Sequence, residues 1–162
     1  MSPRRSTVPD DRRSIREAAS RQRRAEPYAS DPALAAVLQA AVGTPALVRS
    51  PEGHPAFWIV PFVEGLSACG FARVELGGRV SQLGSFGAGP LDRGAWPRAE
   101  FFEKPPPTSI EEIRQRHPHS TFGEPMLSYD RSPARWGWRI ELGGDVGTAF
   151  IATGGWNVRR TA

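Results

Sequence analysis

The sequence predicts an α+β fold: a disordered Arg-rich N-terminal arm, then two related repeats, each a helix followed by an antiparallel meander. Three observations predict this class. Apolar residues recur at helical spacing ahead of two regions in which they alternate with polar residues. Gly and Pro account for 33 of 162 residues and separate the alternating runs as turns. The two alternating regions also share short motifs in the same order, which indicates a duplication.

The first thirty residues carry the whole net charge of +4. They contain eight arginines against four acidic residues, whereas residues 31–162 contain thirteen basic and thirteen acidic residues. The excess of basic over acidic residues therefore lies in the arm, and residues 31–162 have no net charge. Arg outnumbers Lys by twenty to one through the whole chain, and this usage is typical of a GC-rich bacterial genome.

Part of the arm, residues 1–30, is expected to be helical. Residues 1–13 are polar and poor in apolar side chains, so they are predicted to be disordered. Ser14 and Glu17 form a capping box that predicts a short helix from Ile15 to about Arg24. The apolar stripe of this helix is too thin for it to fold alone, so it needs a partner surface.

Residues 31–86 are expected to form the first repeat. Asp31 is a capping residue and Pro32 suits the first helical position, so a helix is predicted over 32–42, with Gly43 as its stop. Strands are expected at 46–49, 56–63, 68–76 and 79–86, with Gly-containing turns between them. Pro61 is expected at an edge or a bulge, because it has no N–H to donate.

A Pro- and Gly-rich linker, residues 87–107, separates the repeats. Leu91, Trp96, Phe101 and Phe102 make it rich in large apolar side chains, so it is expected to pack on the body. Residues 108–162 form the second repeat. A capping box at 109–112 predicts a helix to about residue 116, and strands are expected at 125–129, 134–142, 146–153 and 156–159.

The duplication is read from matched positions. Gly43-Thr44-Pro45-Ala46-Leu47 matches Gly123-Glu124-Pro125-Met126-Leu127 eighty residues later, and Trp58 and Val60 match Trp138 and Ile140 at the same offset. Gly70, Ala72 and Val74 match Gly147, Ala149 and Ile151 at an offset of 77. A duplicated unit fixes the architecture, so we expect each helix to cover one face of an antiparallel sheet. The two sheets are expected to join edge to edge.

A helix before a meander, Gly-x-Pro before the first strand and Trp in the second resemble PepSY-type domains, with residues 38–86 and 110–158 as two copies. The tandem plan is also similar to β-lactamase-inhibitory proteins. These resemblances imply that the chain binds and inhibits a peptidase or a β-lactamase. Proteins of these families are usually secreted or membrane-attached, and the inhibitory proteins carry disulfides. This chain has one cysteine, and its first residues predict no secretory signal, because no apolar run follows them.

The two repeats differ on their outer sheet faces. In the second repeat Arg139 is expected to face solvent, whereas the matching face of the first repeat is apolar. An exposed apolar patch usually marks an interface. We therefore predict that a protein or peptide partner, or a second copy, binds to Phe57, Ile59, Val63 and Phe71. In the alternative, the linker folds over this face.

Signals for catalysis are few. Cys69 lies in an apolar strand, where a lone cysteine is usually part of the core. His54 lies apart from His117 and His119 in the sequence, and a metal site needs at least three ligands. We therefore expect neither an enzyme nor a metal or cofactor site.

The favoured function is non-enzymatic protein or peptide binding in the bacterial cytoplasm. No apolar run is long enough to cross a membrane, so no membrane association is expected. The alternative is a nucleic-acid-associated protein whose arm contacts phosphates. The arginines that would do so are Arg12, Arg13, Arg16, Arg21, Arg23 and Arg24.

Overall fold

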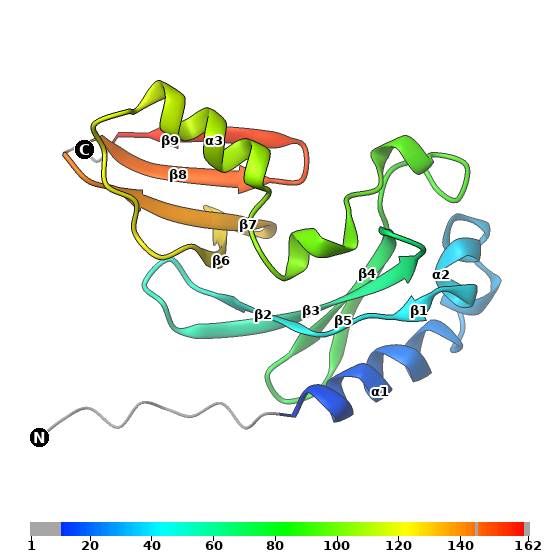
Figure 1. Ribbon diagram of the computed structural model, residues 1–162. Coiled ribbons are helices and arrows are strands. Elements are labelled where there is room, and N and C mark those ends of the chain that lie inside the picture. Colours follow the sequence, from blue (N-terminus) through cyan, green and yellow to red (C-terminus); the bar gives the residue numbers. More distant parts are fainter. Residues whose placement is uncertain (1–10, 145, 161–162) are drawn as a thin grey trace, which may run out of the picture.

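The computed structural model describes residues 11–144 and 146–160, and these form three α-helices and two antiparallel sheets (Figure 1). The α+β class predicted from the sequence is confirmed. The first sheet lies between the N-terminal helices and the second repeat, and the third helix covers the second sheet (Figure 1). Disorder was expected over residues 1–13. Residues 1–10 lie outside the described part of the chain, and for Arg12 and Arg13 the expectation is wrong, because both lie in the first helix.

Helix α1 spans Arg12–Arg23, so it begins three residues earlier than the sequence predicts. Asp11 precedes its first turn and accepts a hydrogen bond from the Ser14 hydroxyl, so Ser14 is not the cap. Ile15 and Ala19 are buried against the first sheet. The helix is therefore stabilised by a partner surface, as its thin apolar stripe requires.

The predicted helix over 32–42 is shorter than expected. Short 3-10 turns span Tyr28–Ser30 and Pro32–Leu34, and helix α2 spans only Ala35–Gln39. Strand β1 (Ala41–Val42) takes the last two positions, because these residues pair with strand β3. The Arg23 guanidinium donates to the carbonyls of Val37 and Ala40, at 3.0 and 2.6 Å, and so caps the helix where it ends.

The first sheet contains β1, β2 (Ala46–Arg49), β3 (Pro55–Glu64), β4 (Ser67–Glu75) and β5 (Val80–Ser85). Strands β1 and β2 follow each other along one side of β3, and β4 lies on the other side. Strands β2, β3, β4 and β5 each begin and end within one residue of the bounds predicted from the sequence. Trp58 lies in the core on the face that α1 and α2 cover.

Pro61 was expected at a sheet edge or a bulge. It lies inside β3, where it pairs with Phe71, one residue before a register shift between Phe62 and Val63. Its carbonyl accepts the N–H of Gly43 at 2.8 Å. Gly43 lies in the gap between β1 and β2, where the ladder is interrupted. The missing N–H of Pro61 therefore costs no ladder hydrogen bond with either strand.

The second repeat contains helix α3 (Pro107–Arg116) and a sheet of β6 (Met126–Asp130), β7 (Ser132–Leu142), β8 (Gly147–Ala152) and β9 (Gly155–Arg159). The helix starts two residues before the predicted capping box, with proline in its first turn. Ile113 is fully buried under it, and the Trp156 indole donates to the Glu112 carboxylate at 2.7 Å.

The linker forms two 3-10 turns, Arg93–Ala95 and Ala99–Phe102. Trp96 joins the core under α1, whereas Phe101 and Phe102 join the core between the two sheets. The predicted packing of the linker is therefore confirmed for these three side chains. It is wrong for Leu91, which is 98% exposed.

The matched sequence positions occupy matched structural positions. Leu47 lies opposite Trp58 in the first sheet, and Leu127 lies opposite Trp138 in the second. Each repeat therefore presents the same four-strand order and register around its tryptophan. The two sheets share no hydrogen-bonded ladder among the described residues, so the expectation that they join edge to edge is wrong. Instead β6 packs against β2.

Candidate functional site

The apolar face proposed for partner binding is covered within the chain. Phe57 and Ile59 are 1% and 0% exposed, and Val63 and Phe71 are half-buried. The side chains that cover this face come from the second repeat and from the linker, and they include Tyr129, Trp136, Phe101 and Phe102.

Neither a partner nor a second copy reaches Phe57 or Ile59 in this fold. The prediction that these two side chains form an accessible binding surface is therefore wrong. The alternative, in which the linker covers the face, is correct in part, because the second sheet covers it as well. Sequence alternation identified an apolar face but not the layer that packs on it.

The arginines of the arm have different environments. Arg16 donates to the carbonyl of Val42 at 2.8 Å, and Arg23 is buried under α2, where desolvation lowers its pKa. Arg13 forms an exposed ion pair with Glu17 at 3.3 Å. The remaining three are exposed: Arg12, whose guanidinium lies 5.9 Å from the Trp58 ring centroid, Arg21 and Arg24. Phosphate binding by the arm stays a prediction, and Arg16 and Arg23 have structural contacts that it would disrupt.

Cys69 is an unreactive thiol in this environment. It is 1% exposed, and its Sγ lies 3.4 Å from the carbonyl oxygen of Phe62. Burial raises the pKa of Cys69 to about 11, so the nucleophilic thiolate is scarce at neutral pH. Among residues 11–144 and 146–160, no three His, Cys, Asp or Glu side chains are grouped to hold a metal ion.

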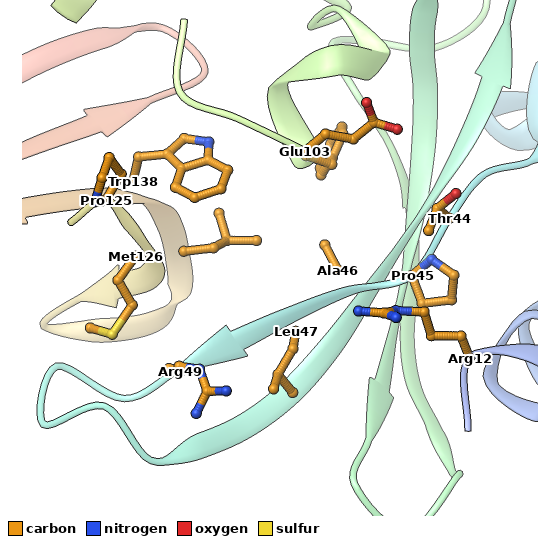
Figure 2. Close-up of a pocket in the computed structure, with 12 residues that line it drawn as sticks. Arg12, Thr44, Pro45, Ala46, Leu47, Arg49, Glu103, Pro125, Met126 and Trp138 are labelled. Carbon is orange, nitrogen blue, oxygen red and sulfur yellow. The ribbon is translucent and has the colours of Figure 1, made fainter. Parts of the chain in front are cut away.

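A cavity of about 400 Å³ lies where the two repeats meet at β2 and β6. Both copies of the duplicated Gly-x-Pro-x-Leu motif border it. Figure 2 shows Pro125, Met126 and Trp138 on one side of the cavity and Thr44, Pro45 and Ala46 on the other. The full lining is Arg12, Thr44, Pro45, Ala46, Leu47, Arg49, Phe102, Glu103, Pro125, Met126, Leu127 and Trp138.

The Trp138 side chain that lines the cavity is fixed by a hydrogen bond and by burial. Its indole Nε1 donates to the Phe101 carbonyl at 2.7 Å, and the ring is almost completely buried. Phe102 lies in the same core and also lines the cavity. The apolar wall therefore exists before any ligand binds.

The direction of the backbone groups in β3 follows from one hydrogen bond. The carbonyl of Pro61 accepts from Gly43 and therefore points toward the β1–β2 side. In an antiparallel ladder, successive residues direct their backbone groups to opposite sides. Ile59 and Phe57, two and four residues earlier, therefore also point toward β2.

The pairing register then assigns the groups of β2. Ala46 and Val48 pair with Ile59 and Phe57, so their N–H and C=O groups face β3. The N–H and C=O of Leu47 lie between these groups and point to the outer side of β2. Those of Arg49 also point outward, because the N–H of the next residue, Ser50, donates inward to the carbonyl of His54. No strand in the described part of the chain pairs with this outer edge of β2. The cavity is thus bordered by a sheet edge with unused backbone donors and acceptors.

Comparison with protein-family models, with curated proteins and with solved structures finds no match to this chain. The resemblance to PepSY-type domains and to β-lactamase-inhibitory proteins therefore stays a prediction. In residues 11–144 and 146–160, no helix has the length and apolar character that crossing a membrane requires.

Proposed function

We propose that the chain is a non-enzymatic peptide-binding domain that takes up an extended segment of a partner protein along the outer edge of β2. The observation that carries this proposal is the unpaired β2 edge, which borders the cavity between the two repeats. Sheet edges with free backbone groups are templates for strand addition. The function predicted from the sequence is kept, but its site moves from the buried Phe57 face to this edge.

In the proposed complex, backbone hydrogen bonds supply the affinity. The N–H and C=O of Leu47 and the outward groups of Arg49 pair with a ligand strand. One apolar ligand side chain enters the cavity between Ala46 and Trp138. Because Trp138 is already fixed by its hydrogen bond to Phe101, little side-chain entropy is lost on binding.

The test uses a display library of random twelve-residue peptides, selected on the full chain. Selected peptides are then made synthetically, and their affinities are measured for the wild-type protein and for two variants. Leu47→Pro removes the outward N–H of an edge strand, where proline does not break the ladder to β3. Leu47→Ala keeps that N–H and is the matched control for loss of the side chain.

We expect Leu47→Pro to weaken binding at least tenfold more than Leu47→Ala does, because one backbone hydrogen bond is lost and its partner on the ligand is left unpaired. Methylating alternate peptide nitrogens should reproduce the loss, and methylating the others should not. Equal affinities of the two variants would overturn the proposal, provided that thermal melting shows both variants folded. Failure to select any peptide that binds the wild-type protein would also overturn it.

A further inference from the structure

Guanidinium groups follow the β1–β2 edge on the face that α1 covers. Arg16 donates to the outward carbonyl of Val42 at 2.8 Å, and Arg49 donates to the carbonyl of Gly53 at 3.1 Å. Arg12 lies over the ring of Trp58 and lines the same cavity as Arg49. Figure 2 shows the side chains of Leu47 and Arg49 on the same side of β2. The edge is therefore cationic on one face.

The contacts of Arg16 and Arg49 position these groups without neutralising them. In both cases the acceptor is a neutral backbone carbonyl. Neither residue forms an ion pair with a carboxylate among the described residues. Arg49 is half-buried, and its bond to Gly53 fixes the guanidinium beside the open edge. A fixed guanidinium is a suitable fork for a carboxylate.

The opposite face of the same edge is apolar. Ala46 points toward Trp138 (Figure 2), and the buried side chains of Leu127 and Phe102 also line the cavity. Glu103 is the acidic residue in the lining of this cavity, and none of the lining arginines shares a strand face with Ala46. The two faces of the β2 edge therefore favour different ligand side chains, acidic on one face and apolar on the other.

We propose that the segment bound at β2 alternates apolar and acidic residues. Successive side chains of a strand point to opposite faces, so every second ligand residue enters the apolar cavity. The residues between them lie beside Arg49, where an aspartate or glutamate side chain is recognised. This inference rests on the proposed strand addition and specifies its ligand as an acidic, amphipathic strand.

The test uses two synthetic nine-residue probes, one alternating valine with glutamate and the other alternating valine with lysine. Affinities are measured for the wild-type protein, for Arg49→Glu and for Arg21→Glu. Arg21 is an exposed arginine at the other end of α1, so its variant carries the same change in net charge away from the edge. Leu47→Pro is measured with both probes.

We expect the glutamate probe to bind the wild-type protein at least tenfold more tightly than the lysine probe, and Arg49→Glu to remove that preference. Arg21→Glu should change either affinity by less than about twofold, because exposed charges at this distance are screened. Equal binding of both probes, with loss of both in Leu47→Pro, would overturn the charge inference and leave strand addition intact. If neither probe binds while library-selected peptides do, the alternating pattern is wrong.

Discussion

Gly43 donates its backbone N–H to the carbonyl of Pro61 at 2.8 Å, and Gly123 donates in the same way to Glu141 in the second repeat. The two glycines are eighty residues apart, and so are the two acceptors. The spaces around them differ, however. A Cβ at Gly43 would lie 2.8 Å from the Pro61 Cγ and 3.0 Å from its carbonyl oxygen, whereas a Cβ at Gly123 would lie 3.3 Å from its nearest neighbour.

This difference predicts unequal effects of the same substitution. Gly43→Ala should lower the free energy of unfolding by about 1–3 kcal/mol, because the new methyl group overpacks against a rigid proline. Gly123→Ala should cost less, since the nearest neighbour of the new methyl group lies at 3.3 Å, which is tight but needs a smaller shift than the 2.8 Å contact at Gly43. Urea unfolding of both variants measures the two values, and a larger loss in Gly123→Ala would contradict the assignment.

The apolar face that includes Phe57 and Ile59 is buried within the chain, which predicts an effect on stability when Ile59 is shortened. Ile59→Ala should lower the free energy of unfolding by about 2–5 kcal/mol, because it opens a cavity between the two sheets. Val63→Ala, at a half-buried position, should cost less. Light scattering gives the mass in parallel. A stable, folded Ile59→Ala protein whose only change is a smaller oligomer would show that this face binds another chain.

Arg23 and Arg24 form a matched pair for the end of α2. Arg23→Ala should cost about 1.5–3 kcal/mol, because two buried carbonyls, those of Val37 and Ala40, lose their charged donor. Arg24→Ala removes the same charge at an exposed position and should stay within about 0.5 kcal/mol of the wild type. Thermal melting of the two variants checks this. Equal melting temperatures would mean that the cap contributes nothing.

The raised pKa of Cys69 predicts a pH-dependent contribution to stability. The thiol ionises near 9.0 in its ordinary state and at about 11 when buried in the folded chain. The folded state therefore holds the proton more tightly, so the contribution is complete below pH 9 and is lost as the pH rises to 11. The difference in unfolding free energy between the wild type and Cys69→Ala should shrink between pH 9 and about pH 11.

Alkylation gives an independent check on the same thiol. Iodoacetamide should modify native Cys69 much more slowly than the urea-unfolded chain at pH 8, because the nucleophile is both buried and protonated. Equal rates in the two states would show that Cys69 is accessible.

Alternation in the sequence located the strands well, because the side-chain period of two is a local property of the chain. Strand β2 has the predicted bounds, and β3, β4 and β5 each differ by one residue at their ends. The duplicated motifs also predicted that Leu47 and Leu127 hold equivalent places. Helix ends were predicted less well. Residues 41 and 42 continue a helical pattern, but pairing with Val63 and Phe62 makes them a strand.

By itself, the sequence determined the α+β class, the two repeats and the apolar character of the Phe57 face, since each depends on neighbouring residues along the chain. The tertiary structure alone decided what covers that face, because burial depends on residues far away in the sequence. Tyr129, for example, stacks on Phe57, and Trp136 packs edge-on against Phe71. It also decided that β6 packs against β2 without pairing with it. The open edge and its cavity result from that packing, and no local pattern encodes it.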